Sequence, residues 1–135
     1  MQRELWEESG KEALSATPDK IGTTRIIGFF RWLEKGGAPE FTGVTRMHCR
    51  IEDVSPDDAE VCNKDGREPQ HIRLTDCTEE ALLKKIDLLM KRNDICLPLY
   101  MNLLFLKQWI LAEDLPETER ETAKAERLSF LFDER

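Results

Sequence analysis

The segment from Pro98 to about Ala112 constrains the fold most. If it forms a helix, apolar side chains lie nearly all the way round that helix. Pro98 suits the first turn of such a helix, where no intrahelical hydrogen bond to its nitrogen is lost. The apolar run is shorter than the ~20 residues that span a bilayer, and Tyr100 and Asn102 interrupt it. We therefore expect a core helix, covered on several sides, and no membrane segment.

Composition and charge narrow the class of protein. A chain of 135 residues fits one domain, and 40% hydrophobic with 35% charged residues is typical of a folded soluble protein. The net charge of -7 argues against a nucleic-acid partner, although divalent cations can bridge acidic side chains to a phosphorylated ligand. The cysteines form no CxxC pair, which favours reduced thiols in a cytoplasmic protein over a zinc site; they are Cys49, Cys62, Cys77 and Cys96.

Two extended runs separated by turn residues predict a β-hairpin between about residues 20 and 54. The first run, 25–33, is rich in β-branched and aromatic residues, and the second covers 40–51. Between them, Gly36 and Gly37 permit the positive φ angles of a tight bend. The polar stretch 55–73 then reads as a surface loop.

Two further helices are expected in the C-terminal half. One begins at Asp76, a candidate N-cap with Glu79 three residues later. Its buried face is predicted by apolar residues at helical spacing, namely Leu82, Ile86, Leu89 and Met90. The last helix follows Pro116, where Thr118 and Glu121 have the spacing of a capping box.

The N-terminal residues carry the most specific chemical signal. Residues 1–15 read as the end of a helix that Gly10 closes. Glu4, Glu7 and Glu8 would share one helical face, with Cβ atoms ~5–6 Å apart. Like charges repel at that spacing unless a cation lies between them, and Mg²⁺ or Mn²⁺ would suit such carboxylate oxygens. On the glutamates alone a solvated acidic face is the favoured interpretation, and it is the ordered string around them that points to a metal site.

The ordered string from Arg3 to Gly10 resembles the C-terminal half of the box that defines the Nudix hydrolases. That box reads Gly-x5-Glu-x7-Arg-Glu-U-x-Glu-Glu-x-Gly-U, where U is a bulky aliphatic residue. The positions that match in type and spacing are Arg3, Glu4, Leu5, Glu7, Glu8 and Gly10. Lys11 departs from the pattern, and the leading glycine and first glutamate of the box would fall before Met1.

The resemblance implies an α/β fold, with a small, mainly antiparallel sheet and packed helices. It implies one Nudix-like domain over residues 1–135, with the box helix and strands in 1–75 and a helical region in 76–135. Glu4, Glu7 and Glu8 would bind Mg²⁺ (or Mn²⁺), and Arg3 would hold one of them by a charge-assisted hydrogen bond. The implied catalytic residues are thus Arg3, Glu4, Glu7 and Glu8, and the implied reaction is hydrolysis of a phosphoanhydride in a nucleoside diphosphate derivative.

The missing half of the box motivates a second hypothesis. In it, the chain is an N-terminally truncated and inactive Nudix-like remnant, or a product of a longer enzyme, that serves as an interaction domain. Without the strands that precede the box in the family, one edge of the sheet would be exposed. The C-terminal helices, or a second copy of the chain in a homodimer, would then have to cover that edge. Enzymatic activity is therefore favoured by the resemblance and left open by the departures.

Other candidate sites have simpler interpretations. His48 and Cys49 are neighbours on a predicted strand and so point to opposite faces, which excludes a hydrogen-bonded dyad. His71 is expected at the surface. A solvated loop is favoured over calcium binding for the acidic residues Glu52, Asp53, Asp57, Asp58 and Glu60. Strand alternation places Phe30 and Trp32 on one side, as core residues or as a surface for stacking a base.

Overall fold

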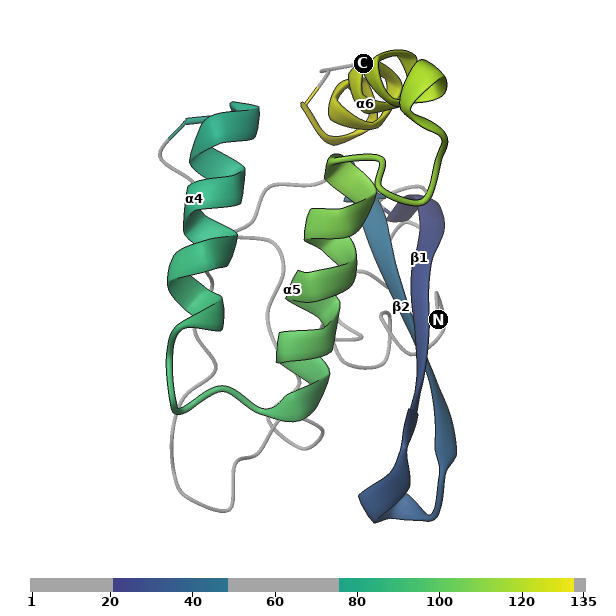
Figure 1. The fold of residues 1–135 in the computed structure, drawn as a ribbon, viewed down its shortest axis with the longest axis vertical. Coiled ribbons are helices and arrows are strands. Elements are labelled where there is room, and N and C mark those ends of the chain that lie inside the picture. The colour runs from purple at the N-terminus through teal and green to yellow at the C-terminus, as the bar shows by residue number, and fades with distance from the viewer. Residues whose placement is uncertain (1–20, 49–75, 133–135) are drawn as a thin grey trace. The chain divides into compact units, whose positions relative to one another are not determined.

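The computed structural model describes residues 21–48 and 76–132. The elements in chain order are β1 (Ile21–Trp32), the 3₁₀ turn η2 (Leu33–Lys35), β2 (Ala38–Met47), α4 (Glu79–Met90), α5 (Leu97–Ile110) and α6 (Glu117–Phe132). β1 and β2 pair in a two-stranded antiparallel sheet, and three helices follow it (Figure 1). A mixed α/β architecture with a small antiparallel sheet is therefore confirmed.

The chain divides into two compact units. Of the described residues, 21–25 and 45–48 belong to one unit, and 26–44 and 76–132 belong to the other. In the described part of the first unit, the hydroxyls of Thr24 and Thr45 lie 2.9 Å apart and hydrogen-bond across the hairpin. The second unit contains the tip of the hairpin and all three helices.

The predicted hairpin is confirmed, including its turn. Gly36 and Gly37 have φ angles of 71° and 76°, which lie in the left-handed region that glycine adopts without a steric penalty. Their amides donate to the carbonyls of Leu33 and Trp32, each at 3.0 Å, so the bend satisfies its own backbone groups. A single 3₁₀ turn, not foreseen from the sequence, closes the end of β1 before these glycines.

All three C-terminal helices are present, but two of the expected caps are wrong. α4 begins at Glu79 with Thr78 as its N-cap, and not with Asp76, because the Thr78 hydroxyl accepts a hydrogen bond from the Ala81 amide at 3.2 Å. α6 begins at Glu117, so Thr118 lies inside the first turn and does not precede it. The fixed φ of Pro116 suits a helix that starts directly after it.

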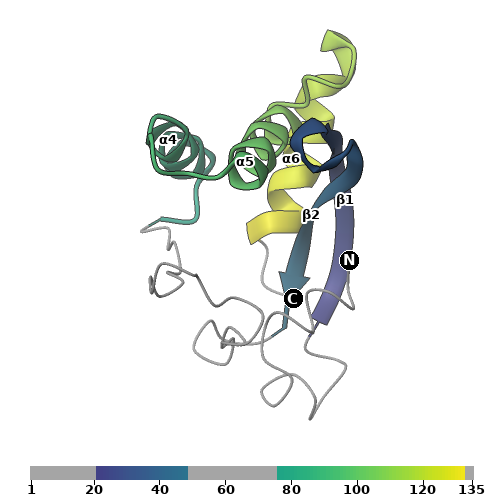
Figure 2. The same ribbon diagram turned by 90° about the horizontal axis from the view of Figure 1, so that it is seen from below.

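The helices α4 and α5 lie side by side, and α6 crosses the C-terminal end of α5 (Figures 1 and 2). Their buried core comprises Ile86, Leu89, Leu103, Trp109 and Ile110. Partly buried side chains from α6 pack against it, namely Leu128, Phe130 and Leu131. Helix α5 is thus covered by both neighbouring helices, as its all-round apolar surface requires.

Two ion pairs join the helices at the margins of this core. Lys107 of α5 lies 2.7 Å from Asp87 of α4, and Lys124 of α6 lies 2.6 Å from Glu79 of α4. All four side chains are partly exposed, so each pair is worth less than about 1 kcal/mol. The apolar core is therefore the main source of stability in this part of the molecule.

The hairpin lies close to α5 at Gly28. A Cβ atom at this position would lie 2.3 Å from Cγ of Phe105, well inside contact distance. Ile27, the preceding residue, packs against the helical core. Glycine within a strand often marks such a close approach, and here it makes room for a ring from α5.

Candidate functional site

The predicted metal site lies outside the described residues. Arg3, Glu4, Glu7 and Glu8 all belong to residues 1–20, whose structure is not described. The arrangement of these carboxylates therefore stays a prediction. Among residues 21–48 and 76–132, no group of three or more His, Cys, Asp or Glu side chains could hold a metal ion.

The secondary candidates are partly described. His48 is exposed, and its imidazole lies beside Gly22, where a Cβ atom would be 2.6 Å from Nε2. Cys77 and Cys96 are both free and exposed thiols. The candidates outside the described residues are His71, Cys49, Cys62, Glu52, Asp53, Asp57, Asp58 and Glu60.

The two aromatic residues expected on one side of the first strand are both half-buried. Phe30 and Trp32 are alternate residues of β1 and share its less exposed face, whereas Phe29 and Arg31 are exposed. Lys35 lies over the Trp32 ring, with Nζ 4.1 Å from the centroid. A cation of the chain itself thus already covers the ring proposed for stacking a base, which favours a structural role for Trp32.

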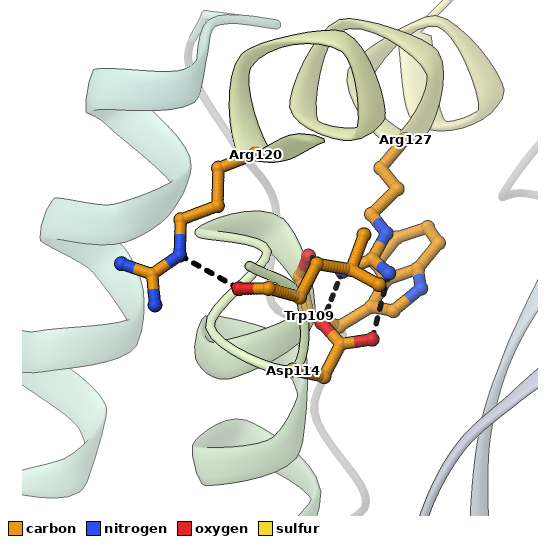
Figure 3. Close-up of polar contacts among 5 residues, drawn as sticks. Trp109, Asp114, Arg120 and Arg127 are labelled. Carbon is orange, nitrogen blue, oxygen red and sulfur yellow. Dashed lines mark hydrogen bonds and ion pairs between the residues drawn. The ribbon is translucent and has the colours of Figure 1, made fainter. Parts of the chain in front are cut away.

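The α5–α6 corner, which comprises residues 109–115 and the α6 arginines Arg120 and Arg127, carries several side-chain hydrogen bonds (Figure 3). Arg127 of α6 donates from Nη1 to the carbonyl of Trp109 and to Oδ1 of Asp114, both at 2.6 Å. Its Nη2 donates to Oδ2 of Asp114 at 2.8 Å, which completes a bidentate pair. Arg120 donates from Nε to the carbonyl of Leu115 at 3.0 Å. Two arginines of α6 therefore bind carbonyls at and just beyond the end of α5.

The hydrogen bonds and charges at this corner favour the ionised form of the Asp114 carboxylate. The hydrogen bonds from Arg127 lower the pKa of Asp114 below its ordinary value, and the adjacent guanidinium charge acts in the same direction. Arg127 itself is 12% exposed, and its guanidinium carbon lies 5.4 Å from the centre of the Trp109 ring. The C-terminal end of a helix also attracts cations, so Arg127 is placed where α5 favours positive charge.

The backbone of the corner is strained at one residue. Ala112 is fully buried and has a φ of 53°, which residues other than glycine seldom adopt. Its amide donates to the Trp109 carbonyl at 3.1 Å, and its carbonyl accepts from Leu115. The chain can hold this conformation because packing and hydrogen bonds surround it on both sides.

A hollow of about 400 Å³ opens next to the corner. Its lining consists of Ile27, Phe105, Gln108, Trp109, Glu113 and Asp114. A larger hollow of about 730 Å³ is lined only by residues of a single segment, from Thr78 to Lys91, and so has one wall. Since ligand sites enclose their ligand, the smaller hollow is the better-formed site in the described residues.

Reasoning from the sequence missed this corner and its hollow. Arg127 and Asp114 are 13 residues apart, which is not a helical spacing, so no local pattern pairs them. Gly28 carried a usable signal, because an isolated glycine in a strand pattern suggests a close approach. A second signal was the pair Glu113 and Asp114, which places two acidic side chains directly after the predicted apolar helix.

Comparisons with known proteins assign no family to this chain. No family model, no curated protein and no solved structure matches it. No helix in the described residues is long and apolar enough to cross a membrane.

Proposed function

We propose that this protein is a magnesium-dependent hydrolase of the Nudix type. Its substrates would be nucleoside diphosphate derivatives, and the bond broken would be a phosphoanhydride. The observation that carries the proposal is the ordered string Arg3-Glu4-Leu5-Trp6-Glu7-Glu8-Ser9-Gly10. The small antiparallel sheet followed by helices is compatible with it at the level of fold class.

The chemistry of the donor set supports a hard divalent cation. Glu4, Glu7 and Glu8 offer carboxylate oxygens at helical spacing, which suit Mg²⁺ or Mn²⁺. Such an ion would neutralise the diphosphate and favour ionisation of a bound water. In the reaction, water oxygen adds to phosphorus, the bridging P–O bond breaks, and two phosphate-bearing products leave. Arg3 would orient one of the glutamates by a charge-assisted hydrogen bond.

A hydrolase assay tests the proposal directly. The purified chain is incubated with nucleoside diphosphates linked to a sugar, to an alcohol or to a second nucleoside, with Mg²⁺ or with excess chelator. We expect product formation from at least one class with Mg²⁺, and none with chelator. Glu7→Gln and Glu8→Gln should each lower the rate by about a hundredfold, an effect of the order expected when a catalytic electrostatic contact is lost.

The matched control is Glu121→Gln, which removes the same charge from an exposed position of α6. It should hydrolyse substrate at the wild-type rate. The proposal is wrong if no substrate class is hydrolysed, or if Glu121→Gln and Glu7→Gln lose activity equally.

An interaction domain that forms a homodimer is the second candidate, and one observation favours it. The outer face of the hairpin exposes Phe29 (48%) and Phe41 (59%), whose rings pack together with centroids 5.2 Å apart. Leu33 at the turn is 80% exposed. Sedimentation equilibrium should then show a dimer that Phe41→Lys dissociates and Leu88→Lys, on α4, does not. A monomer that hydrolyses substrate would refute this candidate.

A further inference from the structure

The hollow beside the α5–α6 corner has the size and lining of a small-ligand site. Its volume of about 400 Å³ falls within the ~300–1,000 Å³ of known ligand pockets. Three apolar side chains, Ile27, Phe105 and Trp109, make up half of its lining. Gln108, Glu113 and Asp114 supply polar groups around them, so the hollow combines apolar surface with a few polar contacts.

The aromatic part of this lining is held in place. Trp109 is 9% exposed, and the Phe130 ring meets it edge-on with centroids 6.2 Å apart. The Arg127 guanidinium lies over the same indole ring. Phe105 is confined on its β1 side by Gly28, where even a Cβ atom would not fit. The part of the indole that Arg127 and Phe130 leave uncovered therefore forms, together with the half-buried Phe105, a preformed aromatic surface, which lowers the entropic cost of binding.

The charge of the lining is negative. Asp114 is held by both nitrogens of the Arg127 fork, which fixes the direction of its carboxylate. Glu113 is exposed, and its carboxylate makes no ion pair or hydrogen bond with the part of the chain that is described. Both acids follow the C-terminal end of α5, where the helix dipole adds negative potential. The two carboxylates of Glu113 and Asp114 and the one guanidinium of Arg127 together give the hollow a net charge of about -1.

The contacts of Arg127 at the corner indicate which kind of group binds there. The Arg127 side chain is a cation on an apolar stem, and it is bound by a carbonyl, a carboxylate and the face of an indole ring. Indole faces and carboxylates both attract cations, and the effect grows when water is partly excluded. Without a bridging cation, a phosphate group would be repelled by the two carboxylates of this lining, which does not include Glu4, Glu7 or Glu8.

We propose that this hollow binds a small organic cation, with an ammonium or amidinium group on an aryl or short alkyl body. The body would pack on Phe105 and Trp109, and the charged group would lie at Glu113. The proposal does not depend on hydrolase activity.

Binding can be followed through the indole signal of Trp109 in ¹H–¹⁵N NMR spectra, identified by its loss in Trp109→Phe. Three probes share a phenyl body and differ in charge: 2-phenylethylammonium, 2-phenylethanol and 3-phenylpropionate. We expect the ammonium probe to bind about fivefold more tightly than the alcohol, and the anion to bind most weakly. Equal affinities for the ammonium probe and the alcohol, or no shift of the Trp109 signal with any probe, would overturn the proposal.

A charge variant locates the cation within the hollow. Glu113→Gln should weaken the ammonium probe about threefold and leave the affinity for 2-phenylethanol unchanged. Glu113 is exposed, so this substitution should not disturb folding. Glu117→Gln, on an exposed residue of α6 outside the lining, is the matched control and should bind as the wild type does. Equal effects of the two variants, or no effect of Glu113→Gln, would contradict the assignment.

Discussion

The α5–α6 corner and the tip of the hairpin differ sharply in how they are stabilised. At the corner, Ile110 and Ala112 are fully buried, and a bidentate arginine binds the end of one helix to the next. At the hairpin, Thr42 is the one buried residue among those described, and its hydroxyl has no hydrogen-bond partner in the described structure. Phe41 and Leu33 there are exposed although they are as apolar as the core of the helices.

The contrast shows that apolar content alone does not locate the core. Two strands bury little area against each other, and an isolated hairpin is marginally stable in water. The hairpin tip therefore depends on its contacts at Ile27 and Gly28, whereas the helices have a core of their own. Substitutions at the corner should lower global stability, and those on the outer hairpin face should not.

The largest expected effect is at Ile110, which is completely buried. Ile110→Ala should lower the free energy of unfolding by about 2–5 kcal/mol, because it leaves a cavity in the packed core. The matched hairpin variant Leu33→Ala should change it by less than about 0.5 kcal/mol, since Leu33 is 80% exposed. Urea unfolding followed by circular dichroism measures both. Similar losses in the two variants would remove the proposed difference between the regions.

The next largest effect is expected at Arg127. Arg127→Ala leaves the Trp109 carbonyl without its guanidinium donor and Asp114 without its cation, and should destabilise the protein by about 1.5–3 kcal/mol. Arg127→Lys should recover only a small part, because an ammonium cannot reproduce the bidentate fork. The control is Arg92→Ala, which breaks the exposed pair with Asp94 and should not change the urea midpoint. Full recovery with lysine would show that charge alone matters here.

Gly28 tests the contact between the hairpin and α5. Gly28→Ala should destabilise the protein by about 1–3 kcal/mol, since the added methyl group overlaps the Phe105 ring. Combining it with Phe105→Leu should reduce that penalty, because the ring that clashes is gone. Urea unfolding of the two single variants and the double variant gives the coupling energy. Strictly additive effects would mean that Gly28 and Phe105 do not touch in solution.

The smallest expected effect is a pH dependence at the corner. Because Arg127 lowers the pKa of Asp114 in the folded protein, this pair adds stability above the ordinary aspartate value of ~3.9. That contribution should be lost as pH falls through the lowered pKa. The stability difference between wild type and Asp114→Asn should therefore be largest near neutral pH and shrink below about pH 4. The effect is small because the Asp114 side chain is 55% exposed.

Local features of the fold were predictable from the sequence, and tertiary ones were not. The turn at Gly36 and Gly37 was foreseen because glycine, which has no Cβ atom, permits the positive φ angles that a tight turn requires. The α4 cap was misplaced, since Asp76 and Thr78 are both competent caps and the geometry selects the second. The Arg127–Asp114 pair could not be foreseen, because the crossing of α5 and α6 brings these residues together.

The candidate sites divide in the same way. Glu4, Glu7 and Glu8 were singled out by spacing along one segment, which a sequence displays directly. The hollow at the corner draws its lining from β1, α5 and the turn after α5, so no single segment reveals it. Contacts between distant segments depend on how the elements pack, and a local sequence pattern does not predict that packing.

Binding of Mn²⁺ to the N-terminal glutamates tests the central claim most directly. Mn²⁺ added to the protein can be followed by the loss of the free-ion signal in electron paramagnetic resonance. The wild-type chain should bind the ion, and Glu4→Gln, Glu7→Gln and Glu8→Gln should each weaken binding by at least about tenfold, as even outer-shell changes do at metal sites. Glu121→Gln should bind as the wild type does. A wild-type chain that binds no Mn²⁺, or three variants that bind it unchanged, would contradict the proposed metal site.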